Sequence, residues 1–180
     1  MKHPVSRRSF LKLGLLAALP APAWANAGLA AAERRLRFHN LHTGEKADLA
    51  YWAEGGYVPE SLAEINRVLR DHRTDEAAVI DPRLLDLLHR LNGSIGAGGA
   101  FEVISGYRSP ASNQALANTS TGVARRSLHM EGKAIDLRLP GIALADLQRA
   151  ALKLQGGGVG YYPASNFVHL DVGRVRAWAG

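Results

Sequence analysis

The order in which two hydrophobic periodicities follow each other along the chain is the strongest constraint on its fold. Apolar residues at helical spacing dominate residues 59–91, whereas short runs typical of strands crowd the second half of the chain. Helices and strands therefore do not alternate as they do in a doubly wound βαβ fold. We expect an α+β fold in which a small, mostly antiparallel sheet has its helices packed on one side.

Turn and capping residues give the boundaries of the predicted elements. Pro59 begins the first helix, and Asp81 with Pro82 begins the second, which we expect to stop at Asn92-Gly93. Two further helices are predicted over 110–118 and 143–155. Strands are predicted over 36–41, 47–52, 100–105, 134–139, 159–162 and 167–172, the first two joined as a hairpin.

The first 25 residues have the layout of an export signal. A basic stretch precedes an apolar run over 10–19, and Ala23-Trp24-Ala25 supplies a cleavage site after Ala25. The order SRRSFLK at 6–12 resembles the twin-arginine type, which the twin-arginine machinery carries across the bacterial inner membrane as folded proteins. The alternative is an uncleaved membrane anchor. We expect a linker over 26–34, one domain over 35–180 and a periplasmic location.

Composition excludes several functions. The chain has no cysteine, so a disulfide scaffold, a cysteine nucleophile and a Cys-based metal site are ruled out. Its net charge of +6 falls to +2 once the signal is removed, because that segment holds four Lys and Arg and no acid. A nearly neutral domain without a basic run gives no support for nucleic-acid binding, and we expect a monomer without nucleic acid as a partner.

One stretch combines residues that bind metal ions, SLHMEGKAID at 127–136, and it is followed later by a second histidine in a strand. Alternation places Asp136 on one face of its predicted strand and His169 on one face of another. Neighbouring strands could therefore bring both to one point, with His129 closing over it. Two imidazoles and a carboxylate suit Zn²⁺ with a fourth position left for water. Each residue taken alone is more often a hydrogen-bonded structural group than a ligand, but a buried Asp with two His requires mutual neutralisation or a metal ion.

A family resemblance adds to this pattern. S-x-H-x-x-G-x-A-x-D, followed by a histidine in a late strand, resembles the zinc peptidases of the hedgehog/D-Ala-D-Ala-metallopeptidase fold. The segment G-Y-R-S-P at 106–110 and the segment from G-V-G-Y-Y to V-R-x-W at 158–178 are similar to the murein endopeptidase branch of that group (MepK type). The resemblance covers about residues 36–178. It implies one zinc ion on His129, Asp136 and His169, and hydrolysis of stem-peptide cross-links in peptidoglycan.

The resemblance also implies roles around the metal. Arg108 matches an arginine directed at the substrate carbonyl, where a fixed positive charge would stabilise an oxyanion. Ser127 matches a serine that contacts substrate, with a plain loop hydroxyl as the alternative. Tyr107 is a further candidate for binding substrate, or a residue that simply packs.

The general base departs from the family pattern. Many relatives carry it two or three residues before the last ligand, but Asn166 and Phe167 cannot accept a proton. Asp171 is the nearest ionisable substitute and lies on the same strand face as His169. It could instead orient His169 or Arg108, and both roles stay open. Glu131 is a more distant candidate for the base.

Two rival functions stay open, the first of them because of that departure. A domain that has lost its base could be a non-catalytic peptidoglycan-binding module on the same fold. The same fold could also serve a D-Ala-D-Ala-type carboxypeptidase or dipeptidase, which would cleave free peptides and ignore cross-links. Of the three functions, we expect the zinc-dependent murein endopeptidase.

Overall fold

The computed structural model describes residues 33–96, 98–119 and 124–180. The predicted signal over 1–25 and nearly all of the predicted linker lie outside the described residues, and the first strand starts at Arg34, the last residue of that linker. None of the helices in the described part of the chain has the length and apolarity needed to cross a membrane.

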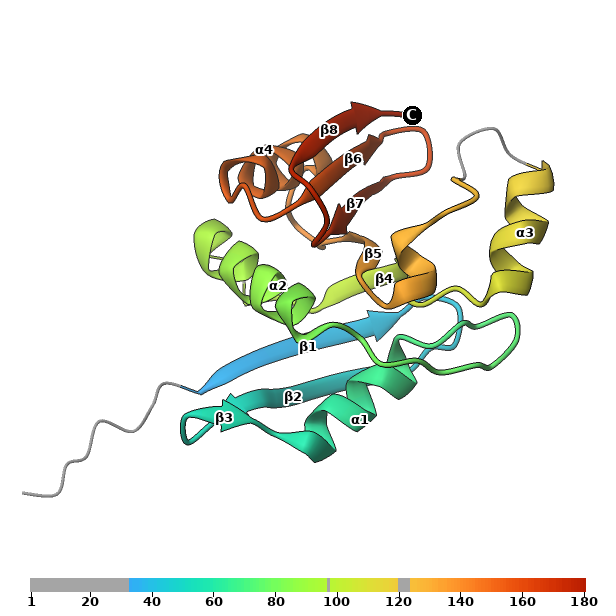
Figure 1. The fold of residues 1–180 in the computed structure, drawn as a ribbon. Helices are drawn as coiled ribbons and strands as arrows, with labels where there is room; N and C mark the ends of the chain where they lie inside the picture. Colours follow the sequence, from blue (N-terminus) through green and yellow to red (C-terminus); the bar gives the residue numbers. More distant parts are fainter. Residues whose placement is uncertain (1–32, 97, 120–123) are drawn as a thin grey trace, which may run out of the picture. The chain divides into compact units, whose positions relative to one another are not determined.

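The described residues form one sheet of eight strands, in the order β3-β2-β1-β4-β5-β7-β6-β8 (Figure 1). The strands are β1 (Arg34–Asn40), β2 (Lys46–Ala53), β3 (Gly56–Tyr57), β4 (Phe101–Ser105), β5 (Ala134–Arg138), β6 (Gly158–Tyr162), β7 (Phe167–Asp171) and β8 (Arg176–Ala179). Neighbours pair antiparallel except β1 with β4 and β6 with β8, which are parallel. The α+β class is confirmed, but the sheet is larger and more mixed than predicted. The two missed strands, β3 and β8, are too short to show a clear alternation.

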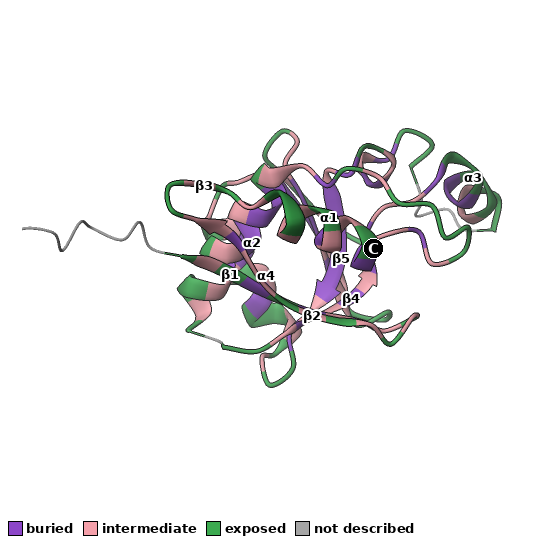
Figure 2. Ribbon diagram, turned by 90° about the horizontal axis from the view of Figure 1, so that it is seen from below, coloured by how far each residue is buried: buried purple, intermediate pink, exposed green. Residues whose placement is uncertain are grey.

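Three of the helices cover one face of this sheet. The described residues form α1 (Pro59–Val68), α2 (Pro82–Ile95), α3 (Pro110–Thr119), α4 (Leu144–Lys153) and a short 3₁₀ helix, η1 (Leu128–Glu131). Side chains of α1, α2 and α4 share a single hydrophobic core with the sheet. Figure 2 shows buried residues along β5 and on part of α2. In contrast, α3 gives no residue to this core, and only Ser112 and Asn113 of it are buried.

The second helix shows where the capping prediction holds and where it fails. The Asp81 side chain accepts a hydrogen bond from the backbone N–H of Arg83 (2.9 Å), as expected of an N-cap. The helix does not stop at Asn92-Gly93 but continues to Ile95. Gly96 ends it in the left-handed conformation, with φ of 67°, where a glycine has no steric penalty.

The strand register places five residues in one line across the sheet. Ser105 pairs with Asp136, Asp136 with His169, His169 with Gly160 and Gly160 with Trp178. Directly paired residues lie on the same face. Their strand neighbours Ile135, Leu137, Val168 and Leu170 belong to the helix-covered core, so this line of residues lies on the opposite face.

Candidate metal centre

Three side chains from separate elements, η1, β5 and β7, meet on the face of the sheet opposite α1, α2 and α4. His129, Asp136 and His169 each offer one ligand atom, and these atoms lie within 4.8 Å of one another. His169 Nδ1 is 2.8 Å from Asp136 Oδ1, and His129 Nε2 is 3.2 Å from both of these atoms. The structure thus brings together the three residues that the sequence pattern selected.

The local sequence around His129 fixes its position. Ser127 caps η1 by accepting a hydrogen bond from the His129 backbone N–H (3.3 Å). Gly132 ends η1 with φ of 63°, and any side chain there would collide with the backbone carbonyl of Val79. This explains the glycine of the motif, because other residues disfavour the left-handed region and none would fit. The His129 Nδ1–H donates to the carbonyl of Gly106 (2.7 Å), which directs Nε2 toward the other two ligand atoms.

The far nitrogen of His169 is held by Asp171. His169 Nε2–H donates to Asp171 Oδ2 at 3.1 Å, which leaves Nδ1 facing Asp136. Asp171 is fully buried and also accepts hydrogen bonds from the backbone N–H groups of Gly158 and Gly173 and from both terminal nitrogens of Arg176. Both of its oxygens are therefore engaged, and it lies on the side of His169 away from the ligand atoms.

Arg108 completes the surroundings of Asp136. Its Nη2 donates to Asp136 Oδ2 at 2.5 Å and its Nε donates to the hydroxyl of Ser105 at 3.0 Å. The second carboxylate oxygen of Asp136 is therefore occupied, and only Oδ1 faces the two histidines. Charge-assisted hydrogen bonds of this kind fix orientation as well as adding energy.

Burial and charge act in opposite directions on these groups. Burial lowers the pKa of His129. Burial would also lower the pKa of His169, but hydrogen bonds to Asp136 and Asp171 outweigh it and raise that pKa. Burial would raise the pKa of Asp136, yet the charge and hydrogen bonds of the two histidines hold it well below its ordinary value. The carboxylate is thus ionised, as a metal ligand must be.

The donor set fits a bound cation. Since a carbonyl can only accept, His129 carries its proton on Nδ1, and its Nε2 has a free lone pair when the ring is neutral. His169 Nδ1 donates to Asp136 when the ring is protonated, but in the neutral ring, the form that binds a metal ion, Nδ1 is an acceptor because Nε2 carries the proton that Asp171 accepts. With both rings neutral, three acceptor atoms therefore converge on one point. The separations of 2.8–3.2 Å approach the ~3.4 Å between two ligands of a tetrahedral ion bound at about 2.1 Å. A divalent cation would satisfy all three at once.

The two histidines of the ligand cluster line a pocket of about 260 Å³, whereas the buried Asp136 is not part of its lining. It is lined by Arg108, Ala124, Arg126, Ser127, Leu128, His129, Tyr162, His169, Arg176 and Trp178. Tyr107 is not among these residues, and its side chain packs against the core. Glu131 is also absent from the lining and pairs with Lys133 at the surface (2.7 Å).

Sequence reasoning missed the roles of Arg176 and Trp178, which form the C-terminal wall of the pocket together with Tyr162. The Trp178 ring lies 5.2 Å from that of His169, its Nε1–H donates to the Tyr162 hydroxyl (2.8 Å), and Arg176 stacks over it at 4.9 Å. Gly160 makes this possible, because a Cβ there would come within 2.7 Å of the Trp178 ring. The segment V-R-x-W carried the signal, but its register on β6 could not be read from the sequence.

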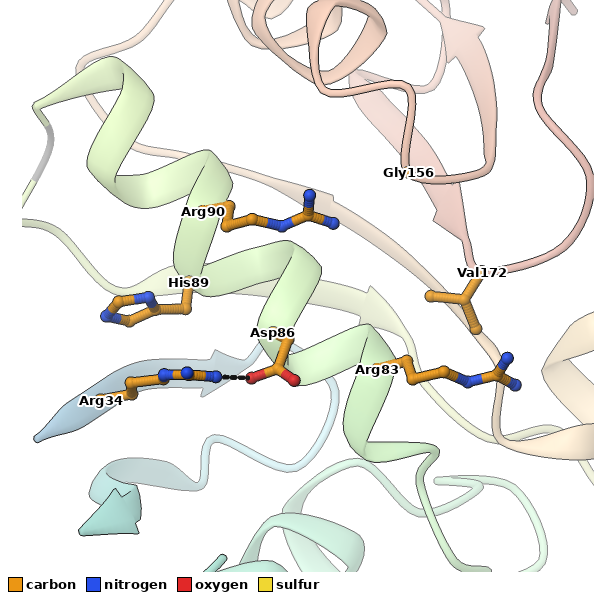
Figure 3. A pocket seen from close by; sticks show the side chains of 7 residues that line it. All are labelled: Arg34, Arg83, Asp86, His89, Arg90, Gly156 and Val172. Atoms are coloured by element: carbon orange, nitrogen blue, oxygen red, sulfur yellow. Dashed lines mark hydrogen bonds and ion pairs between the residues drawn. The ribbon is translucent and has the colours of Figure 1, made fainter. Parts of the chain in front are cut away.

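A larger cavity of about 610 Å³ lies elsewhere, where α2 faces the start of β1 and the segments around Gly156 and Val172. Figure 3 shows Arg34 paired with Asp86 (2.7 Å), while Arg83 and Arg90 extend from α2 toward Gly156 and Val172. Among the described residues, the only group of three or more potential metal ligands is the one around His129. The larger cavity therefore contains no such group.

Comparison with known proteins agrees with the arrangement of the site. The family model Peptidase_M15_2, described as peptidoglycan L,D-endopeptidase MepK, matches residues 28–178. The chain is 44% identical to the peptidoglycan L,D-endopeptidase MepK of Escherichia coli (strain K12) over 181 residues, which cover 98% of this chain and 99% of that protein. The probable peptidoglycan L,D-endopeptidase MepK of Haemophilus influenzae is 40% identical over 148 residues, or 82% of this chain and 80% of that protein. No solved structure gives a significant match. The resemblance inferred from the motifs is confirmed, and the chain belongs to the MepK family of M15 peptidases.

Proposed function

We propose that this chain is a zinc-dependent peptidoglycan endopeptidase that hydrolyses stem-peptide cross-links. The observation that carries the proposal is the meeting of three ligand atoms, from His129, Asp136 and His169, beside a pocket that the two histidines line. The proposal is supported by relatives that match 98% and 82% of the chain and are named peptidoglycan L,D-endopeptidase and probable peptidoglycan L,D-endopeptidase.

His129, Asp136 and His169 are the residues that hold the ion. A bound Zn²⁺ supplies Lewis-acid chemistry, which polarises a carbonyl oxygen and activates water near neutral pH. The protein contributes by fixing the ligands before the ion arrives, since Gly106, Arg108 and Asp171 each hold the far side of one ligand. Such outer partners are worth about 10–100-fold in metal affinity or activity.

Arg108 has a second role beside its hydrogen bond to Asp136, which is to bind the substrate carbonyl. Its guanidinium lines the pocket, and its hydrogen bonds to Asp136 and Ser105 use only two of its five N–H donors. The remaining donors can reach an oxygen that gains negative charge during peptide hydrolysis. A guanidinium that is already fixed stabilises such charge without reorganising.

Asp171 acts as a positioning residue for His169. Its complete burial, its hydrogen bonds to five donors and its place behind the imidazole support this role over that of general base. Burial alone would raise its pKa, but His169, Arg176 and the two backbone N–H groups hold the pKa well below its ordinary value. A carboxylate held in this way is a poor proton acceptor near neutral pH.

The protein acts in the periplasm after export through the twin-arginine route. The support is the sequence pattern over 1–25 and a substrate that belongs to the cell wall. The double substitution Arg7→Lys with Arg8→Lys is expected to abolish export of the protein. Cell fractionation measures how much of the protein reaches the periplasm. Normal export of this variant would instead indicate the general secretory route.

The decisive experiment incubates purified protein with cross-linked muropeptide dimers and identifies the products by mass spectrometry. We expect cleavage of the cross-link that a chelator abolishes and that stoichiometric zinc restores. Retention on peptidoglycan sacculi without any zinc-reversible cleavage would indicate a binding module. Release of terminal D-Ala from free peptides, with cross-links left intact, would indicate a carboxypeptidase.

A further inference from the structure

We propose that Arg126 is a specificity residue that binds a free carboxylate of the substrate peptide beside the metal centre. The proposal rests on the peptidoglycan endopeptidase function proposed above and deepens it, because it states which chemical group of the stem peptide the pocket selects.

The pocket over the metal centre is rich in positive charge. Three arginines line it, Arg108, Arg126 and Arg176. Arg108 is committed to Asp136, and Arg176 places both terminal nitrogens on Asp171. These two guanidinium groups are thus neutralised by carboxylates that belong to the site itself.

Arg126 has no such partner. All 16 Asp and Glu residues of the sequence lie within the described part of the chain, and none of them forms an ion pair with Arg126. The residue is exposed and directly precedes Ser127, whose hydroxyl caps η1, so a short ordered connection ties its backbone to the helix that carries His129. It is therefore the one arginine of the pocket lining whose charge the described residues leave unpaired.

The neighbouring arginine does not share this position. Arg125 lines a separate cavity, together with residues of α3 such as Pro110 and Asn113, and does not line the pocket over the metal centre. Two consecutive residues of identical chemistry thus differ in the cavity they face. This gives a control variant with the same change in charge at almost the same place in the chain.

The chemistry of the substrate supplies the partner. A peptide ends in a carboxylate, and an acidic residue linked through only one of its carboxyl groups keeps the other free. With a divalent ion bound, positive charge in the pocket exceeds the two buried carboxylates, which favours an anionic substrate. The planar guanidinium fork matches a carboxylate in bidentate geometry.

The test compares a series of substrates with three proteins. The substrates are a cross-linked stem-peptide dimer with free carboxylates and the same dimer with these groups converted to carboxamides, one at a time and together. The proteins are the unmodified enzyme, Arg126→Gln and Arg125→Gln. At one position of the dimer, we expect the unmodified enzyme and Arg125→Gln to cleave the free carboxylate with a kcat/KM about tenfold higher than the carboxamide. A factor of about ten lies between the contributions of exposed and of buried charged pairs. Arg126→Gln should show no preference.

The kinetic pattern and its salt dependence sharpen the result. The lower catalytic efficiency of Arg126→Gln toward the free carboxylate should appear as a higher KM with little change in kcat, since the contact lies outside the reacting bond. The preference of the unmodified enzyme should decline with added salt, because the pair is exposed to solvent. A preference that survives in Arg126→Gln, or that vanishes equally in Arg125→Gln, would overturn the proposal.

A binding measurement separates this proposal from the proposed function. Calorimetry of the chelator-treated proteins with the cleaved product peptide, as the acid and as the amide, needs no catalysis. Tighter binding of the acid by about tenfold, absent only in Arg126→Gln, is expected. Cleavage of all the dimers without discrimination would reject the role of Arg126 but keep the endopeptidase. No cleavage of any dimer would reject the endopeptidase, and the calorimetry would still decide whether Arg126 selects a carboxylate.

Discussion

The same three-part arrangement occurs at two places in this molecule, and only one of them adjoins the ligand cluster. At the metal centre, Asp171 pairs with Arg176 (2.7 Å), which stacks on Trp178 at 4.9 Å. Beside the larger cavity, Asp86 pairs with Arg34 (2.7 Å), which stacks on Trp52 at 4.7 Å. A carboxylate, an arginine and a tryptophan are therefore not sufficient to mark a functional site.

The difference lies in the other donors to each carboxylate. Asp86 also accepts from the hydroxyls of Tyr51 and Tyr57, which have no further bonding capacity directed at a ligand. Asp171 accepts instead from His169, whose second ring nitrogen faces Asp136 and His129. The arrangement around Asp86 ends in structural tyrosines, whereas the one around Asp171 continues to the candidate cation site. Cavity size alone would select the wrong place, since the larger cavity is the one that has no group of metal ligands.

Histidine substitutions test this comparison with the largest expected effect. His129→Ala and His169→Ala should each lose the bound zinc, and with it essentially all activity, because two remaining ligands hold the ion poorly. His89→Ala is the matched control, since His89 lines the larger cavity. It should keep both metal and activity.

Metal content by mass spectrometry and cleavage of muropeptide dimers are the two measurements. Stoichiometric zinc in either ligand variant would remove that residue from the metal site. Loss of zinc in His89→Ala would show that the two regions are not independent.

Much of the fold could be predicted because its signals are local. Apolar spacing and Pro59, Pro82 and Pro110 located the first three helices, whose observed starts are these prolines. The C-terminal limit of α2 was wrong because Gly93 can be accommodated in a last helical turn, and Gly96 supplies the left-handed cap. The parallel pairings of β1 with β4 and of β6 with β8 were missed, since pairing between distant segments leaves no local trace.

The site was partly predictable for the same reason. Alternation within strands correctly placed Asp136 and His169 on one face, and the register then pairs them directly. The partners that fix the ligands were harder to find. The carbonyl of Gly106 is a backbone group with no sequence signal, and Arg176 reaches Asp171 only because β8 lies beside β6.

Replacement of the two equivalent carboxylates sharpens the comparison at an intermediate magnitude. Asp171→Asn keeps the shape of the side chain but removes the charge that holds the His169 N–H. We expect zinc affinity or turnover to fall about 10–100-fold, the usual effect of losing such a partner. Asp86→Asn should leave zinc affinity unchanged, because its network does not reach a ligand.

Competition with a chromophoric chelator measures the zinc affinity of both variants, and the pH profile of kcat/KM separates two roles for Asp171. A positioning residue predicts reduced activity with the same shape of profile. Disappearance of the acidic limb of the profile, with zinc affinity intact, would instead establish Asp171 as the general base.

The smallest expected effect concerns stability and tests the purely structural role of the second arrangement. Burial would raise the pKa of Asp86, but hydrogen bonds from Tyr57, Tyr51 and Arg34 hold it below its ordinary value of 3.8. The unfolded chain therefore takes up a proton at Asp86 near pH 3.8, while the folded chain does so only at lower pH. Since the unfolded state binds more protons in this window, the stabilisation is complete above it and is lost as the pH falls.

Asp86→Asn should accordingly lower the free energy of unfolding by about 1 kcal/mol at neutral pH, and the difference from the unmodified protein should shrink below pH 4. Denaturant unfolding at a series of pH values measures both. Asp146→Asn is the control, because its ion pair with Arg149 is exposed and such pairs contribute little. A constant difference across the acidic range would mean that Asp86 stabilises the fold through its shape rather than its charge. That outcome would break the parallel with Asp171, since the comparison requires both carboxylates to act as anions and to differ only in what their donors touch next.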